Sequence, residues 1–482
     1  MRIAIIILAL VLLLCLSAVP MVPSAEATSP VWETEGQMPG ERSGFVSAEL
    51  YDGRMLIALG YNSSAAEHID DTWIFDPGEV TWTAVADSPV MTEASTAACI
   101  NDVVYIFGGR LSNYSYMETV LVYNVYENEW SVGPVAPFEG MFLKAAAIDD
   151  HRIIIVGTDP DRRGCYIYDT LAMSFSEAEA LPEGRLSGTL VKDNERLMYF
   201  GGWDSTNTVQ EEVFGYNIGS DYWWTVSVMP EARFGMTGVM GTDGLVYLLG
   251  GAAIVNWYSD SLEKCLAFDT YYGNFIELPD LPEAVRYAAA VESEDGRIIC
   301  FGGHEGNLGM LNVYSVQAWE VEASLSSDTV EQGGSVWLSV SVHTSFAPME
   351  ELYGYAFLTA MGVTYAVYDI YSLGNMAYLE IPISEGITPL GYVVEIYDLG
   401  FNYEQDFVFE PMALTVTAAP STDDRLDDLQ GQLDSLQDEL NSTRDELKEA
   451  VDAKMDAMIG YVILIMVIAT LVVAVLLLVR KR

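Results

Sequence analysis

Short apolar runs that end on glycine recur along the first two thirds of the chain. The run "VVYIFGG" at residues 103–109 is an example, and an uninterrupted apolar stretch of this length is typical of a buried strand. Similar runs end at Gly60, Gly108-Gly109, Gly157, Gly201-Gly202, Gly250-Gly251 and Gly302-Gly303. The first glycines of successive runs lie 44 to 52 residues apart. This period predicts one supersecondary unit that is used several times.

Two further patterns follow the same period. A pair of turn-forming residues precedes each glycine run, and such pairs tolerate the positive φ of tight hairpins. These pairs are Asp52-Gly53, Asn101-Asp102, Asp149-Asp150, Asp193-Asn194, Asp243-Gly244 and Asp295-Gly296. Two aromatic residues seven positions apart follow the glycines, and a proline comes seven positions later, as in Tyr123, Trp130 and Pro137. The unit is therefore two strands joined by a tight turn, a loop, and two more strands.

This repeat resembles the Kelch motif, and the segments "YIFGGR", "YNVYENEW" and "MPEARFG" carry the resemblance. The resemblance implies four-stranded blades around an axis, so we expect an all-β fold with a six-bladed β-propeller over residues 28–318. The pattern departs from the family at Gly60 and Gly157, where one glycine of the pair is missing.

The two ends of the repeat region predict how the ring closes. Trp32 stands seven residues before Pro39 without a preceding aromatic partner, while Tyr314 has no clear partner after it. We therefore expect the strand near Trp32 to complete the last blade, which would leave no open edge.

The remaining segments predict three kinds of structure. Residues 319–418 contain alternating runs such as "SVWLSVSVH" and resemble an immunoglobulin-like β-sandwich. Residues 419–458 are interpreted as a linker and a coiled-coil stalk, because leucines keep a three-four spacing. The stalk predicts a possible homo-oligomer; a lone acidic helix or a disordered spacer is the alternative.

Apolar segments near both ends predict the location of the protein. Residues 1–27 have the charged, hydrophobic and small-residue parts of a signal peptide. Residues 459–479 carry no charge and have the length of a transmembrane helix, and residues 480–482 are a basic cytoplasmic tail. The prediction is a single-pass type I protein of the cell membrane, with the bulk of the chain extracellular.

Charge and cysteine usage narrow the functional class. The 70 acidic and 22 basic residues give a formal net charge of −48, which excludes a nucleic-acid binder of the usual phosphate-neutralising kind. A strongly acidic surface is more often a device for solubility than a binding site. Beyond Cys15, the four cysteines are widely spaced, so we interpret them as buried thiols without excluding one bridged pair.

The sequence shows no catalytic or metal-binding constellation. Its four histidines stand at unrelated phases of the repeat, and no nucleophile elbow or phosphate loop is present. We therefore predict a non-catalytic protein without metal or cofactor. The Kelch resemblance leaves open a glycan-modifying enzyme of the sialate-related type, and a structural component of the cell envelope is a further alternative.

Candidate ligand-binding residues gather in two kinds of loop that share one end of each blade. One set follows the repeat prolines and consists of Arg42, Arg185, Arg233 and Arg286, and the other follows the glycines and consists of Tyr61, Arg110, Trp203 and His304. Arginine forks suit carboxylate, phosphate or sulfate, and aromatic planes suit sugars. We expect an extracellular protein or an anionic glycan as the ligand; the alternative is that each arginine pairs with a buried carboxylate. Asn62, Asn113 and Asn441 are glycosylation candidates, and the first two would crowd this face.

Overall fold

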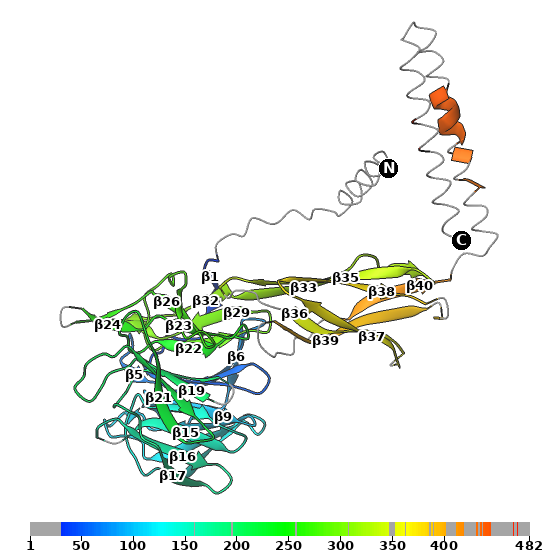
Figure 1. Ribbon diagram of the computed structural model, residues 1–482. Helices are drawn as coiled ribbons and strands as arrows, with labels where there is room; N and C mark the ends of the chain where they lie inside the picture. The colour runs from blue at the N-terminus through cyan, green and yellow to red at the C-terminus, as the bar shows by residue number, and fades with distance from the viewer. Residues whose placement is uncertain are drawn as a thin grey trace.

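A computed structural model of the protein describes most of the chain between residues 30 and 418. The described residues are 30–418 except 159, 194–195, 256–257, 307, 347–351, 362, 385–386, 389 and 402–410, and also 430–444 except 432, 433 and 436, with 466 and 470. Two β units lie next to each other, one built from β1 to β32 and one from β33 to β40 (Figure 1).

The first β unit contains six four-stranded antiparallel sheets in its described part. Sheet 1 consists of β2 (Val46–Glu49), β3 (Met55–Ala58), β6 (Thr72–Asp76) and β7 (Thr81–Val85). Sheet 2 consists of β9 (Thr96–Ile100), β10 (Val103–Phe107), β12 (Thr119–Asn124) and β13 (Glu129–Val135). Sheet 3 consists of β14 (Lys144–Ala147), β15 (Arg152–Thr158), β16 (Gly164–Asp169) and β17 (Ser174–Ala178).

The other three sheets repeat this order, except that the last one takes its fourth strand from the start of the chain. Sheet 4 consists of β18 (Thr189–Asp193), β19 (Arg196–Phe200), β20 (Glu212–Asn217) and β21 (Tyr222–Val228). Sheet 5 consists of β22 (Thr237–Met240), β23 (Leu245–Leu249), β26 (Cys265–Asp269) and β27 (Phe275–Glu277). Sheet 6 consists of β28 (Ala289–Glu292), β29 (Arg297–Phe301), β32 (Asn312–Gln317) and β1 (Glu33–Gln37). Short hairpins between the second and third strands are formed by β4 (Tyr61–Asn62), β5 (Glu67–His68), β24 (Ala252–Val255), β25 (Tyr258–Ser261), β30 (His304–Glu305) and β31 (Leu308–Gly309), while β8 (Thr92–Glu93) pairs with β11 (Arg110–Leu111).

The patterns in the sequence account for the construction of each sheet. In sheet 2, Asn101 and Asp102 both have positive φ, as a tight hairpin turn between β9 and β10 requires. Tyr123 and Trp130 are directly opposite each other on β12 and β13, with ring centroids 4.9 Å apart. The spacing of seven is therefore the length of a hairpin that brings two aromatic rings together.

The glycine pairs lie where one sheet meets the next. The Gly109 N–H donates to the carbonyl oxygen of Gly140, in the loop that leads into sheet 3, over 2.7 Å. Gly108 and Gly109 have φ values of 60° and 96°, and a Cβ on Gly108 would lie 2.6 Å from the same carbonyl oxygen. Only glycine combines this backbone conformation with so close an approach.

The first strand of the described chain closes the array of sheets. β1 pairs antiparallel with β32, with Glu33 opposite Ser315. The Trp32 indole, which is 6 % exposed, donates a hydrogen bond of 2.9 Å to the carbonyl oxygen of Pro279. The predicted pairing of the segment near Trp32 with the last sheet is confirmed.

The second β unit has two sheets around an apolar core. One sheet contains β33 (Trp319–Leu325), β35 (Ser335–Thr344) and β38 (Met376–Pro382). The other contains β34 (Thr329–Glu331), β40 (Met412–Thr417), β39 (Gly391–Phe401), β36 (Leu352–Ala360) and β37 (Val363–Ser372). As the alternation in "SVWLSVSVH" predicts, Leu338 is buried and Trp337 is exposed. The immunoglobulin-like classification and the domain boundaries stay predictions.

The sequence predicts a location at the cell membrane, and the structure contradicts this prediction. A membrane span needs about 20 apolar residues in one helix, and within the described residues no helix is both long and apolar enough to cross a bilayer. A single-pass type I membrane protein, and the membrane as a partner, are therefore not supported. The predicted signal peptide at 1–27 and all of 459–479 except Met466 and Thr470 lie outside the described residues, as do residues 480–482.

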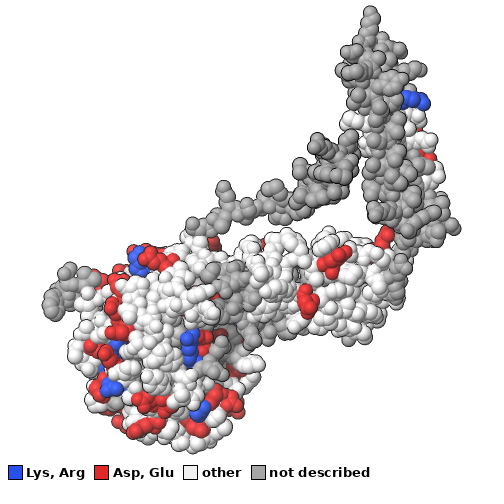
Figure 2. Space-filling model, viewed as in Figure 1, with Lys and Arg blue, Asp and Glu red and all other residues white. Residues whose placement is uncertain are grey.

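The predicted stalk is described only in part. Residues 430–444 are helical wherever they are described, and the leucine pattern falls largely outside the described residues. Oligomerisation through this segment stays a prediction. Acidic side chains form several separate patches on the visible surface of the first β unit, whereas the visible face of the second carries few charges (Figure 2).

Candidate functional site

Three of the predicted ligand-binding arginines are buried and paired inside the protein. Arg42, Arg185 and Arg233 are 1 %, 0 % and 3 % exposed. Arg185 donates to Glu212 Oε2 over 2.9 Å and to the Gly184 carbonyl oxygen over 2.9 Å. Its guanidinium carbon lies 4.9 Å from the centre of the Phe214 ring, a cation–π distance.

The other two buried arginines have similar internal partners. Arg42 Nη2 donates to Asp71 Oδ1 over 2.5 Å, and Arg233 donates to the Lys264 carbonyl oxygen over 3.0 Å. Desolvation lowers the pKa of Arg233, and Glu231, 3.4 Å away, opposes this effect. The three arginines are thus paired, but the alternative of a buried carboxylate partner is met only in part, because the Asp71, Glu212 and Glu231 side chains are 41 %, 35 % and 48 % exposed. A direct ligand role for the three arginines stays a prediction.

Arg286 and His304 form a different kind of pair at the start of sheet 6. Arg286 Nε donates to His304 Nε2 over 3.1 Å, and Arg286 Nη1 donates to Ser259 Oγ over 2.9 Å. Burial first, and then the charge of Arg286, lower the pKa of His304 to about 4. The imidazole is therefore neutral at pH 7, and among the described residues Arg286 has no carboxylate partner.

The predicted ligand-binding residues of sheets 1, 2 and 4 contact neighbouring side chains of the protein. Arg110 pairs with Glu93, whose carboxylate also lies 3.7 Å from His68. Tyr61 meets His68 edge to face. Trp203 is half-buried and lies against Phe234, with ring centroids 4.1 Å apart.

Sequence reasoning missed a cavity that lies over sheets 2, 3 and 4. It has a volume of about 890 Å³ and is lined mainly by aromatic and aliphatic side chains. We call the surface around it the loop face; in these sheets it comprises residues 108–118, 136–143, 160–163, 179–188 and 201–211. The large apolar lining residues are Tyr116, Phe138, Met141, Phe142, Leu143, Tyr166, Leu186 and Trp203. A cavity of this size and lining is typical of a ligand-binding site.

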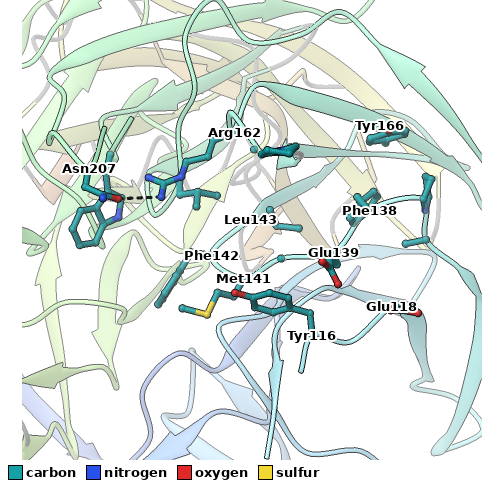
Figure 3. Close-up of a pocket in the computed structure, with 17 residues that line it drawn as sticks. Tyr116, Glu118, Phe138, Glu139, Met141, Phe142, Leu143, Arg162, Tyr166 and Asn207 are labelled. Atoms are coloured by element: carbon teal, nitrogen blue, oxygen red, sulfur yellow. Dashed lines mark hydrogen bonds between the residues drawn. The ribbon is translucent and has the colours of Figure 1, made fainter. Parts of the chain in front are cut away.

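Arg162 is the cation of this cavity. It donates to the Asp204 carbonyl oxygen and, over 3.0 Å, to Asn207 Oδ1, so it bridges the loops of sheets 3 and 4 (Figure 3). Among the described residues it has no carboxylate partner, although Glu118 and Glu139 also line the cavity. Arg162 does not stand at the same position of the repeat as the other candidate arginines. The only signal for it in the sequence is its place in the loop after a glycine run.

Among the described residues, the groups that could bind a metal and the cysteines provide no second candidate for a functional site. Asp149, Asp150 and His151 approach one another within 4.8 Å, but Arg152 Nε already donates to Asp149 Oδ2 over 2.6 Å. Cys99, Cys165, Cys265 and Cys300 are free thiols. The glycosylation candidates Asn62, Asn113 and Asn441 stay predictions; Asn113 is exposed on the loop face.

Comparisons with known proteins point to one family. Residues 92–134 match the Kelch motif. Beta-scruin of Limulus polyphemus is 24 % identical over 50 % of this chain and 23 % of its own length. Kelch-like protein terF of Aspergillus terreus is 25 % identical over 46 % of this chain and 52 % of its own length. Kelch-like protein 35 of Mus musculus is 26 % identical over 30 % of this chain and 25 % of its own length. The chain thus spans a quarter to a half of the length of these relatives.

A solved structure supports the same fold. The protein described as "Structure of YjhT" superposes with a TM-score of 0.50 and covers 58 % of this chain and 98 % of its own. The two sequences are 14 % identical, so the likeness concerns the β-propeller fold alone.

Proposed function

Because this chain belongs to the Kelch-repeat family, we propose that it is a non-catalytic binding protein whose β-propeller presents the loop face to a partner protein. The six four-stranded sheets are taken as six blades of one ring. Contacts of the first strands in chain order, from β2 to β9, β14, β18, β22 and β28, support this arrangement.

The observation that carries the proposal is the cavity of about 890 Å³. Apolar side chains line a space large enough for one or two side chains of a partner, and such pockets hold the anchors of protein interfaces. Arg162 at the same cavity supplies a positive charge for a carboxylate, and its guanidinium keeps further N–H groups besides those that bond Asp204 and Asn207. The preferred ligand is therefore a protein segment that combines an aromatic or aliphatic anchor with an acidic residue.

The sequence-predicted residues take different parts in this proposal. Trp203 lines the cavity, and Arg286 with His304 offers a second cation nearby on the loop side of sheet 6. Arg42, Arg185 and Arg233 hold neighbouring loops in place through their internal pairs. An anionic glycan is the other ligand class that the cations would accept, and it forms a separate arm of the test.

The proposal is tested by selecting ligands on the folded chain. A phage-displayed random peptide library and a set of acidic oligosaccharides are probed against the wild type, Tyr116→Ala and Arg162→Ala. Peptides with an apolar anchor and an acidic residue should bind the wild type and lose about tenfold in affinity with either variant, as the loss of one interface anchor predicts.

Tyr51→Ala is the matched control. Tyr51 is 90 % exposed in the turn between β2 and β3, at the opposite end of the strands from the glycines. Selected peptides should bind this variant as they bind the wild type. Selection of no peptide, or of peptides indifferent to Tyr116 and Arg162, would contradict the proposal, and exclusive binding of oligosaccharides would replace the protein ligand with a glycan.

A further inference from the structure

A second cavity lies inside the ring of sheets. It has a volume of about 360 Å³ and is lined by the first strands of all six sheets. Its wall is built largely from small and hydroxyl-bearing residues, among them Ser47, Ala97, Ala145, Thr237 and Gly238. We call this space the channel.

Lys144 is the cation at the end of the channel nearest the loop face. It is the first residue of β14 and pairs with Val156, beside the glycine at position 157. Among the described residues, no hydrogen bond or ion pair engages its ammonium group. Water reaches the side chain in part, but protein surrounds it, and this desolvation lowers the pKa of Lys144 to about 8.

The other charged groups of the channel lie toward its opposite end. Glu49 is the last residue of β2, next to the turn at 52–53, and burial raises its pKa. Lys192 is near the end of β18, and its ammonium donates to the Ile148 carbonyl oxygen over 3.3 Å. Lys144 therefore has no counter-charge at its own end.

A ring of backbone hydrogen bonds surrounds the mouth of the channel above Lys144. Five bonds of 2.6 to 3.1 Å join six equivalent residues of the six sheets, and in each bond the N–H of one residue donates to the carbonyl oxygen of the equivalent residue in the preceding sheet. The six residues are Gly44, Ala94, Phe142, Ser187, Gly235 and Tyr287, and all have φ between 56° and 64°.

Two bulky residues occupy this ring where glycine would be unstrained. Phe142 and Tyr287 come from sheets 3 and 6, three positions apart in the ring, and their rings stack at 5.0 Å and 23°. Phe142 lines both the cavity of the loop face and the channel, so this aromatic pair separates the two spaces. Strained backbone at such a position is typical of a functional constraint.

We propose that the channel is a binding site for a small oxyanion, a carboxylate or a phosphate, held by the Lys144 ammonium beneath the Phe142–Tyr287 pair. A largely enclosed ammonium group without a partner is costly, and an oxyanion supplies both the missing charge and the hydrogen-bond acceptors. The hydroxyl groups of Ser47 and Thr237 add donors along the wall.

This site is independent of the partner protein proposed for the loop face. Inorganic phosphate, sulfate and acetate are each titrated by calorimetry against the full chain and Lys144→Met. The wild type should bind at least one of them, and Lys144→Met should bind it about tenfold more weakly, the effect of losing one charge-assisted hydrogen bond. Lys264→Met, which removes an exposed lysine paired with Asp280, is the control and should bind as the wild type does.

A second measurement starts from the wild-type chain, so its first arm does not depend on the folding of a variant. Reductive methylation with ¹³C-formaldehyde labels each lysine, and the bound anion should slow the labelling of Lys144 but not that of Lys264. Phe142→Gly, which suits the positive φ, should speed the labelling of Lys144 several-fold if the aromatic pair covers it. Equal anion affinity in wild type and Lys144→Met, or labelling of Lys144 unaffected by every anion, overturns the proposal.

Discussion

Two carboxyl groups, of the buried Asp243 and the half-buried Glu292, lie where the first β unit meets the second. The Glu292 carboxyl accepts hydrogen bonds from the Thr242 N–H over 2.8 Å and from the Trp319 indole over 2.8 Å. Desolvation outweighs these bonds and, with the charge of Asp243, raises the pKa of Glu292 to about 8. Burial likewise raises the pKa of Asp243 to about 6, although the Tyr247 hydroxyl donates to it over 2.6 Å.

The stability of the protein should fall as the pH rises from about 6 to 8. The folded state keeps a proton on Glu292 that the unfolded state, with an ordinary pKa of 4.5, has already lost. This group contributes a loss of at most about 1.4 kcal/mol per pH unit. Urea unfolding of Glu292→Gln should show a flatter pH dependence above pH 6 and a more stable protein at pH 8.

Glu294→Gln is the control for this experiment, because Glu294 is an exposed acid two residues away. It should keep the pH dependence of the wild type. A Glu292→Gln variant that loses stability between pH 6 and 8 as steeply as the wild type would show that Glu292 is not protonated in the folded state.

At the scale of the elements, the end of the second strand of a sheet depends on glycine for two reasons. The backbone at Gly109 has φ 96°, and a Cβ there would overlap the Ser95 hydroxyl and lie 3.0 Å from the Glu93 carbonyl oxygen. Gly53, in the turn between β2 and β3, also has positive φ, but nothing lies within 4 Å of a Cβ at that position. A substitution at Gly53 therefore tests backbone strain alone, whereas one at Gly109 tests backbone strain together with close packing.

Gly109→Ala should lower the free energy of unfolding more than Gly53→Ala. Backbone strain alone costs about 1–2 kcal/mol, which is the loss expected for Gly53→Ala. Gly109→Ala adds the overlap with Ser95 and Glu93, so the free energy of unfolding should fall by more than about 3 kcal/mol. Urea denaturation followed by tryptophan fluorescence measures both losses. Equal losses would mean that the segment around Ser95 relaxes without cost.

At the scale of the whole molecule, the ring is held by a contact between segments far apart in sequence. β1 supplies the fourth strand of sheet 6, and Trp32 packs beside it against residues of sheets 5 and 6. The Gly303 N–H also donates to the Arg42 carbonyl oxygen over 3.0 Å, which joins sheet 6 to sheet 1. Loss of the β1 pairing would leave β32 as an open edge.

Trp32→Ala should open this closure first. The cavity left by the indole should cost about 3–5 kcal/mol, and the amides of β32 that face β1 should lose protection from hydrogen exchange before those of β10. Val31→Ala, which removes a side chain that is 68 % exposed, is the control and should change neither. A destabilised Trp32→Ala protein with β32 still protected would show that the pairing does not depend on Trp32.

The sequence alone determined the repeated strands, their hairpins and the closure by the segment near Trp32. These features depend on local chemistry: positive φ at Asn101 and Asp102, an aromatic pair at Tyr123 and Trp130, and alternation around Leu338. Apolar character alone misled the prediction of location, because residues 459–479 have the composition of a span, whereas the described part of the chain contains no helix that could serve as one.

Only the tertiary structure decided which side chains are available to a ligand. Arg185 and Arg162 are both arginines in loops of the same face, but Arg185 meets Glu212 from the next sheet and Arg162 meets no acid in the described chain. Lys144 stands in a strand of alanines, and its place beside the channel depends on five other sheets. The partner of a charged group is set by packing between distant segments, and a repeat pattern carries no information about it.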